Sequence, residues 1–221
     1  MQLDLNKLIC AIEDYRYLLE RNYPDKGVLK WVGDRYKLSS LERTLLYRGI
    51  TTRDQAKRFS TRLVGKPEGP LIVDGYNVLF TLLNYRLGYP VFISTDHLCR
   101  DAGSQFGKIT NEEVFEECCS TLLTYSGKLN LVQIIIYLDK PVTNSTSHLN
   151  ILQKLALQAC PECQVKLVDS ADESLVKHKS GVLATSDSSI LSQSSNPIFD
   201  LPHTIIEQFY NGSILDLETI V

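Results

Sequence analysis

The chain has 221 residues, a formal net charge of −3 and 43% apolar residues, which is enough for one large or two small folded domains. No apolar run approaches the length of a membrane span, and residues 1–21 form an amphipathic pattern rather than a signal sequence. The composition therefore argues against a membrane protein, and we expect a soluble protein of the cytoplasm.

Charge is divided unevenly along the chain. Residues 1–66 hold 14 Lys and Arg against 8 Asp and Glu, a balance of +6, and residues 67–221 hold 9 against 18, a balance of −9. Such asymmetry indicates contact with nucleic acid, although basic residues also occupy ordinary solvated helix faces.

The first 66 residues predict a small all-helical domain. Apolar spacing predicts a helix over about 5–20, and Ser39 with Glu42 forms a capping-box pattern that opens a second helix ending at Gly49. A third helix is expected over about 52–63, and the outline resembles a helix-turn-helix, which many small bundles share. Glycines and prolines in residues 65–70 then mark the domain boundary.

Basic residues cluster on and before the third predicted helix. They either contact nucleic-acid phosphates or form a solvent-facing surface, and the sequence leaves both interpretations open. The cluster consists of Arg43, Arg48, Arg53, Lys57, Arg58 and Arg62.

Residues 67–221 alternate between predicted strands and helices. The expected strands are 71–74, 90–94, 132–138, 164–168, 182–185 and 197–200. The expected helices are 77–87, 111–126, 145–159, 171–179, 187–192 and 203–210. This alternation predicts an α/β domain with a mainly parallel sheet and helices on both faces.

Aspartates follow several of these strands. Asp74 ends the apolar run LIVD, Asp139 ends the middle strand, and Asp172 and Asp187 follow the next two. Parallel strands deliver their carboxyl ends to one edge of the sheet, so we expect these side chains to converge there.

An aspartate after a strand, taken alone, is more often the N-cap of the next helix. Several carboxylates placed together repel one another, and a divalent cation removes that cost. Oxygen ligands of this kind favour Mg²⁺ or Mn²⁺, either of which can activate water against a phosphodiester.

Other α/β functions lack their motifs. The chain has no G-x-G-x-x-G after its first strand, no P-loop and no G-x-S-x-G elbow. A receiver-type signalling domain needs a lysine at a late strand end, where this chain carries Asp187 and Asp200.

Three short motifs resemble the PIN-like nucleases, in particular their NYN branch: Asp74-Gly75-Tyr76-Asn77, Ala171-Asp172-Glu173 and Ala184-Thr185-Ser186-Asp187. The resemblance covers roughly residues 70–221. The whole chain is similar to a two-domain microbial family that joins a small helical domain to a PIN-like domain. The stretch 33–38, with Glu42-Arg43 and Arg48-Gly49, carries that part of the resemblance.

The resemblance implies a Mg²⁺- or Mn²⁺-dependent ribonuclease. It implies Asp74, Asp172 and Asp187 as metal ligands, and Asp139 as a further catalytic acid. Asn77, Glu173, Thr185 and Ser186 are implied as supporting residues. PIN proteins usually carry another acid on the helix before the middle strand, and Glu113, Glu116 and Glu117 all remain candidates.

Two further features stay open. The loop 95–110 contains Arg100, Asp101 and Lys108, which either bind a phosphate or close over the site, or are solvated loop charges. Cys160-Pro-Glu-Cys163 lacks the second pair of a zinc site and is interpreted as reduced thiols in a helix-to-strand turn.

These observations predict a metal-dependent phosphodiesterase that acts on RNA, with RNA as partner, no membrane contact and a homodimer as one allowed assembly. The alternative on the same fold is a catalytically inactive RNA-binding or regulatory module. A second alternative makes the helical domain a protein-docking scaffold, for which RNA binding would be absent or insensitive to salt.

Overall fold

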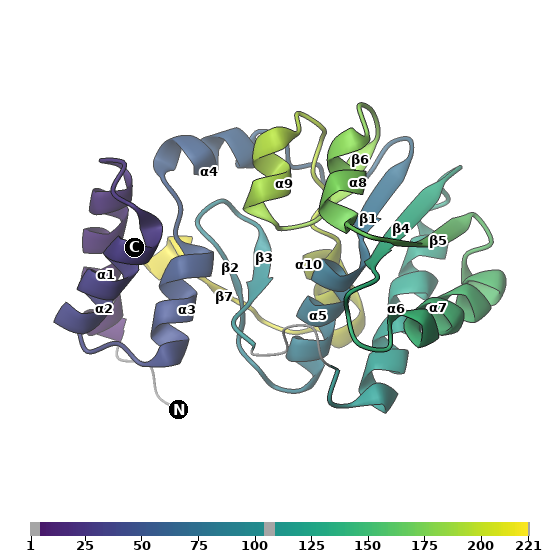
Figure 1. The fold of residues 1–221 in the computed structure, drawn as a ribbon, viewed down its shortest axis with the longest axis horizontal. Coiled ribbons are helices and arrows are strands. Elements are labelled where there is room, and N and C mark those ends of the chain that lie inside the picture. Colours follow the sequence, from purple (N-terminus) through teal and green to yellow (C-terminus); the bar gives the residue numbers. More distant parts are fainter. Residues whose placement is uncertain (1–4, 104–108, 221) are drawn as a thin grey trace. The chain divides into compact units, whose positions relative to one another are not determined.

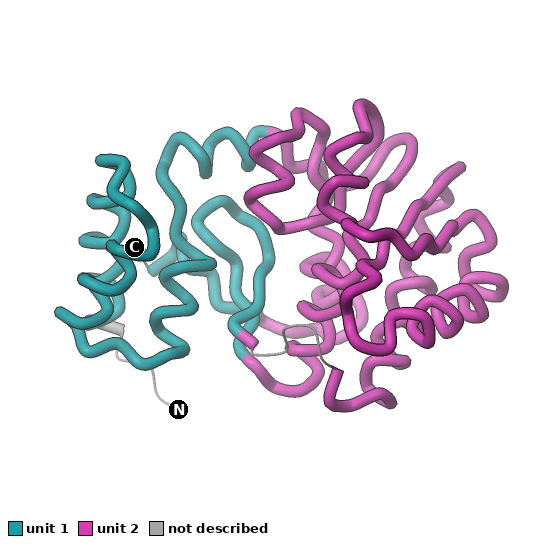
Figure 2. Tube along the Cα trace, viewed as in Figure 1, with its two compact units in different colours: residues 1–61, 90–102, 214–221 teal, residues 62–89, 103–213 magenta. Residues whose placement is uncertain are grey.

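The computed structural model describes residues 5–103 and 109–220, and these fall into two compact units (Figure 2). Unit 1 comprises residues 1–61, 90–102 and 214–221, and unit 2 comprises residues 62–89 and 103–213. The expected division at residue 66 is close to the end of the first segment of unit 1. Residues 90–102 and 214–221, which were expected in the second domain, belong instead to unit 1.

Unit 1 contains the helices of the N-terminal region, as Figure 1 shows. They are α1 (Leu5–Leu19), α2 (Asp25–Arg35), α3 (Ser40–Gly49) and α4 (Arg53–Ser60). The predicted capping box opens α3: the Ser39 hydroxyl accepts the Glu42 amide at 3.3 Å, and the Glu42 carboxylate accepts the Ser39 amide at 2.7 Å. Helix α2 was not predicted, since only a short segment around Trp31 was expected there.

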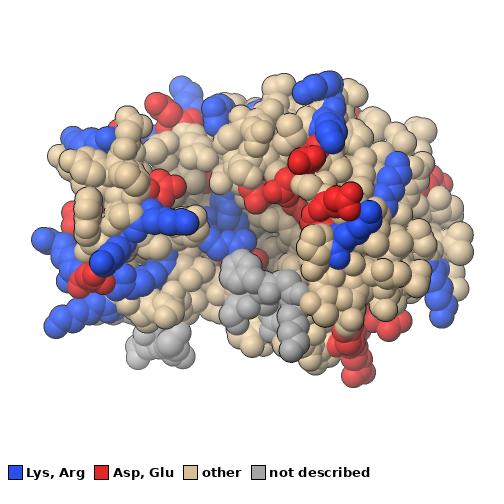
Figure 3. All heavy atoms as spheres, in the orientation of Figure 1, with Lys and Arg blue, Asp and Glu red and all other residues tan. Residues whose placement is uncertain are grey.

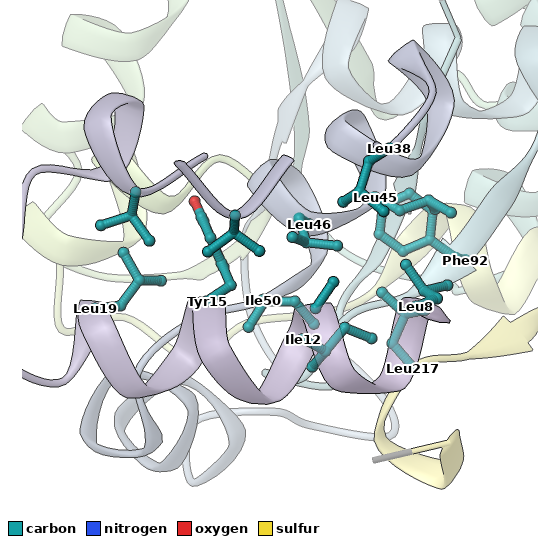
Figure 4. Close-up of a cluster of buried hydrophobic side chains, with 13 residues drawn as sticks. Leu8, Ile12, Tyr15, Leu19, Leu38, Leu45, Leu46, Ile50, Phe92 and Leu217 are labelled. Carbon is teal, nitrogen blue, oxygen red and sulfur yellow. The ribbon is translucent and has the colours of Figure 1, made fainter. Parts of the chain in front are cut away.

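Among its described residues, unit 1 also contains three short strands. They are β2 (Val91–Ile93), β3 (Cys99–Asp101) and β7 (Leu215–Asp216), in the order β3-β2-β7. Phe92 and Leu217 from these segments are fully buried in one apolar cluster with Leu8, Ile12 and Leu46 of the helices (Figure 4). Burial of these side chains explains why residues 90–102 and 214–221 join the helical region.

Within its described residues, unit 2 is built on a four-stranded sheet in the order β5-β4-β1-β6, with all neighbours parallel. Its strands are β1 (Leu71–Asp74), β4 (Ile134–Asp139), β5 (Cys163–Val168) and β6 (Val182–Ala184). Its helices are α5 (Gly75–Arg86), α6 (Glu112–Lys128), α7 (Ser145–Ala159), α8 (Ala171–Lys177), α9 (Ser188–Gln193) and α10 (Leu201–Ile205). The predicted α/β class with a mainly parallel sheet and a helical N-terminal region is confirmed.

Helices cover the sheet on both faces. Ile72 and Leu183 are aligned in neighbouring strands and pack with Leu175 of α8 and Ile190 of α9. Side chains alternate along a strand, so the adjacent residues face the other way, toward α5. Gly75 at the start of α5 accordingly lies against the side chain of Ile136, where a Cβ would be 3.0 Å from Cγ2.

The order of the strands indicates where a ligand would bind. Along the chain the strands of this sheet run β1, β4, β5, β6, and the chain builds outward from β1 to β5 before β6 returns to the other side of β1. The strand order therefore reverses between β1 and β6. In open parallel sheets, ligands bind beyond the carboxyl ends of the strands at this reversal.

Several predicted elements differ in detail. The strand expected at 197–200 is reduced to bridges from Ile198 to Leu63 and Leu183, and the last helix is α10 followed by a π-helix, Ile206–Tyr210. The loop expected at 95–110 contains β3, and its residues 104–108 lie outside the described part of the chain. No helix among the described residues is both long and apolar enough to cross a bilayer.

Candidate functional site

Asp74 is the last residue of β1 and also the N-cap of α5. It is 5% exposed, a low value for an aspartate. Its Oδ1 accepts the Asn77 amide at 3.3 Å, and its Oδ2 accepts the Thr185 hydroxyl at 2.9 Å. One carboxylate therefore joins the ends of the two strands on either side of the order reversal.

A second set of hydrogen bonds secures the same junction. The side-chain oxygen of Asn77 accepts both the amide and the hydroxyl of Ser186, at 3.0 Å and 3.2 Å. The Thr185 hydroxyl accepts the Asp187 amide at 3.2 Å. The structure thus brings Asn77, Thr185 and Ser186 together with Asp74, where the sequence placed supporting residues.

Burial raises the pKa of Asp74 from 3.8 to about 7. The hydrogen bonds from Thr185 and Asn77 oppose this rise, while the nearby carboxylates of Asp172 and Asp139 add to it. At neutral pH this group is poised between its two protonation states, a property that functional sites share with some structural clusters.

Asp172 lies at the start of α8, where its pKa is also raised. The causes are partial loss of hydration and then the charges of Asp187 and Asp139. Carboxylates from β1, from β4 and from the starts of α8 and α9 are therefore close enough to repel one another. In Figure 3, Asp and Glu atoms gather over α8 and α9.

Each of the remaining aspartates also accepts a backbone amide. Asp139 Oδ1 accepts the Ala171 amide at 2.7 Å, and Asp187 Oδ1 accepts the Ser189 amide at 2.7 Å as the N-cap of α9. These aspartates therefore accept amides at the starts of helices and also lie near the other carboxylates of the cluster. An ionised carboxylate offers about four lone-pair sites, so a single amide leaves acceptor capacity for a cation.

The donor set suits a hard divalent cation, because it consists of carboxylate and hydroxyl oxygens and its carboxylates repel one another. Asp74, Asp172 and Asp187 would hold Mg²⁺ or Mn²⁺. Among residues 5–103 and 109–220, however, no three Asp, Glu, His or Cys side chains are already arranged as a coordination group. Binding would therefore require side-chain adjustment at this edge.

The three candidate acids of α6 remain untested as partners of the site. Glu117 pairs with Arg86 at 2.7 Å, and Glu113 and Glu116 are exposed. The residue that sequence reasoning missed is Glu112. Burial is the main cause that raises the pKa of Tyr76, and the charges of Asp139, Cys119 and Glu112 add to it, so Glu112 lies within electrostatic range of Tyr76.

A buried polar pair, formed by Tyr76 of the DGYN motif and His148, lies near Glu112. The Tyr76 hydroxyl and His148 Nδ1 are 2.9 Å apart, and both side chains are buried. His148 Nε2 lies 3.7 Å from a Glu112 carboxylate oxygen. In the sequence, Glu112 stands out only by its position at the start of a predicted helix. No pattern around His148 indicates that the two residues lie close together.

Glu173 sits on the exposed side of α8. Its amide donates to the Ser170 hydroxyl at 3.1 Å and its carboxylate lies 3.6 Å from the ammonium of Lys177. Nothing in these contacts links it to Asp74.

Arg100 and Asp101 belong to β3 of unit 1, not to the unit that carries the acidic cluster. Arg100 is 4% exposed and forms two hydrogen bonds with the Asp96 carboxylate, at 2.7 Å and 2.8 Å. Asp101 is buried and pairs with Arg48 at 3.3 Å. Both side chains are buried and paired within unit 1, and a role in phosphate binding or in closing over the site stays a prediction.

The predicted basic cluster divides into two groups. Arg43 donates to the Leu38 carbonyl and to Asp34, and Arg48 pairs with Asp101. Arg62 donates to the carbonyls of Asn196 and Leu191. Arg53, Lys57 and Arg58 are exposed on α4, and Arg53 borders a hollow of about 450 Å³ where α1 ends and α4 begins. Figure 3 shows further Lys and Arg atoms over the helices of unit 1.

Comparison with known proteins shows which families the chain resembles. A family model described as "Domain of unknown function (DUF5616)" matches residues 66–204, and one described as "Protein of unknown function (DUF434)" matches residues 7–62. The chain is 30% identical over 202 residues to "Uncharacterized protein MJ0935" of Methanocaldococcus jannaschii, which covers 89% of this chain and 95% of that protein. No solved structure matches the chain.

Proposed function

This chain belongs to the family described as "Domain of unknown function (DUF5616)", and we propose that it is a Mg²⁺- or Mn²⁺-dependent phosphodiesterase that hydrolyses RNA in the cytoplasm. One observation carries the proposal. Asp74, Asp139, Asp172 and Asp187 come from distant parts of the chain and interact electrostatically at the reversal of strand order. The DGYN, ADE and ATSD motifs, which resemble those of PIN-like nucleases, supply Asp74, Asp172 and Asp187, and Asp139 ends β4.

The protein's own residues prepare this edge for phosphodiester chemistry. The Thr185 hydroxyl and the Asn77 amide hold the Asp74 carboxylate, and Asn77 ties Ser186 to the same place. A bound divalent ion would supply charge neutralisation at the phosphate and an acidified water. Hydrolysis adds that water across one P–O ester bond and yields a phosphate monoester and a hydroxyl group.

A second candidate function is a non-catalytic RNA-binding module on the same fold. It is favoured by the amide bonds already made by Asp139 and Asp187, and by the lack of a ready coordination group among the described residues. In that case the carboxylates are N-caps and part of a polar junction between strands.

The two functions are separated by a cleavage assay on a 5′-labelled single-stranded RNA with Mn²⁺, with Mg²⁺ or with EDTA. We expect cleavage with either metal and none with EDTA. Asp74→Asn and Asp187→Asn should each lose more than the roughly 10- to 100-fold that removing an outer-shell partner costs. Asp169→Asn is the matched control, because Asp169 follows β5 but its side chain is 91% exposed and pairs only with surface Lys140 in the contacts described.

A metal titration gives an independent readout. Mn²⁺ binding to the wild type, followed by electron paramagnetic resonance, should weaken in Asp74→Asn and remain in Asp169→Asn. RNA binding without cleavage, together with identical Mn²⁺ binding in all three proteins, would reject the phosphodiesterase and leave the RNA-binding module.

A further inference from the structure

Two exposed aromatic side chains lie together at the start of α2. Tyr23 is 44% exposed and Trp31 is 56% exposed, and their rings meet edge to face with centroids 6.2 Å apart and planes at 72°. The other side of α2 is anchored in the core by Val28 and Val32, which are 0% and 3% exposed. The helix is therefore fixed with this aromatic pair facing outward.

The surface beside the rings is open. Gly27 is one helical turn before Trp31, on the same side of α2, and a Cβ built there would meet no heavy atom within 4 Å. A larger residue at this position would stand beside the indole. Its absence leaves room for a flat group next to Trp31.

Positive charge accompanies the aromatic pair. Lys26 and Lys30 are exposed on α2, and they are separated by one turn of the helix. Of the two acids of α2, Asp34 is paired with Arg43 at 2.9 Å. Residues 1–66 as a whole carry a balance of +6, which makes this region complementary to a polyanion.

We propose that Tyr23, Gly27 and Trp31, with Lys26 and Lys30, form a binding surface for single-stranded nucleic acid, here called the Tyr23–Trp31 platform. An unpaired base stacks on the exposed indole over Gly27, and the lysines contact the adjacent phosphates. Stacking on an aromatic face accepts any base, so binding is tolerant of sequence. This inference rests on the proposed function and defines its substrate class as single-stranded RNA.

A protein partner is the competing occupant of such a surface. It would bury the rings as well, but it has no need for the lysines and would bind with little dependence on salt. A duplex is a further test case, because its bases are already stacked and unavailable to an indole.

Trp31 is the single tryptophan of the chain, so intrinsic fluorescence reports this surface directly. Titration of the full-length protein with an eight-nucleotide oligouridylate in EDTA should quench the fluorescence to saturation. The affinity should fall as salt is raised. A double-stranded RNA of equal length should quench weakly. Equal quenching by the duplex, or binding of labelled oligouridylate with no change in Trp31 fluorescence, would overturn the platform.

Variants test the same surface by anisotropy of a labelled oligouridylate. Trp31→Ala should weaken binding roughly 5- to 150-fold, and Trp31→Phe, which keeps a ring, should recover part of the loss. Lys30→Ala should lower the slope of log Kd against log salt by about 0.7. Tyr89→Ala is the control, since Tyr89 is 41% exposed but lies in unit 2. Unchanged affinity in Trp31→Ala, with its circular dichroism preserved, would reject the proposal.

The experiments distinguish a failure of the Tyr23–Trp31 platform from a failure of the proposed phosphodiesterase activity. Asp74→Asn should bind oligouridylate as the wild type does, and Trp31→Ala should still cleave at saturating RNA. Tight binding without cleavage in the wild type contradicts the phosphodiesterase alone. Cleavage in which Trp31→Ala leaves both Kd and the half-saturating RNA concentration unchanged contradicts the platform alone.

Discussion

The buried carboxylate of Asp74 makes the stability of the protein depend on pH in a definite direction. Its pKa is about 7 in the folded protein, against 3.8 for the ordinary group. Below pH 3.8 it is protonated in both the folded and the unfolded state and contributes nothing. As pH rises to about 7 the unfolded state ionises first, and the folded state progressively loses stability. Above pH 7 the loss is complete, at about 4 kcal/mol.

Asp74→Asn removes this titration, so it should stabilise the protein more at pH 8 than at pH 5. The two pH units between 5 and 7 contribute about 1.4 kcal/mol each, and the stabilisation should therefore grow by about 3 kcal/mol between the two conditions. Hydrogen bonds gained or lost by the amide at this position act equally at both pH values and cancel in the difference.

The assay is urea unfolding followed by far-ultraviolet circular dichroism, for the wild type, Asp74→Asn and Asp169→Asn at pH 5 and pH 8. Asp169→Asn controls for the loss of one surface charge. Mn²⁺ at pH 8 should raise the unfolding free energy of the wild type and leave that of Asp74→Asn nearly unchanged. If the pH dependence of Asp74→Asn matches that of Asp169→Asn, the assignment of a buried, repelled carboxylate is refuted.

Three further predictions concern stability measured by urea unfolding at pH 7. Asp96→Ala leaves the buried guanidinium of Arg100 without its bidentate partner and should cost about 3–5 kcal/mol; a loss below about 1 kcal/mol would mean that this pair is solvated. Gly75→Ala places a Cβ 2.7 Å from a carbonyl of β4 and should lower the unfolding free energy by about 1–3 kcal/mol. Gly27→Ala, where the Cβ meets open space, should raise the unfolding free energy by up to about 1 kcal/mol. Equal effects of the two substitutions would contradict the packing described. Ser39→Ala removes one half of the capping box and should cost about 1 kcal/mol, and an unchanged midpoint would show that α3 does not need its cap.

The aspartates of unit 2 show which structural features a local sequence pattern predicts and which it does not. A short apolar run that ends on Asp74 and glycine specifies a buried strand and a sharp entry into a helix, because both depend on neighbouring residues only. Parallel strands share one carboxyl edge, and the electrostatic interaction of Asp74 with Asp139 and Asp172 follows from that rule. The pattern did not predict that Glu112 lies near His148, because that proximity depends on how α6 and α7 pack.

Local patterns also specified the capping box of α3, the alternation of strands and helices, and the α/β class. Tertiary packing alone decided that residues 90–102 and 214–221 join the helices of unit 1, where Phe92 and Leu217 are buried. It also decided that Arg100 is a buried structural charge, since a loop arginine carries no local sign of the enclosure around it. The physical reason is the range of the forces involved. Backbone preferences, caps and hydrophobic periodicity act over a few residues, whereas burial depends on surfaces supplied by segments distant in the chain.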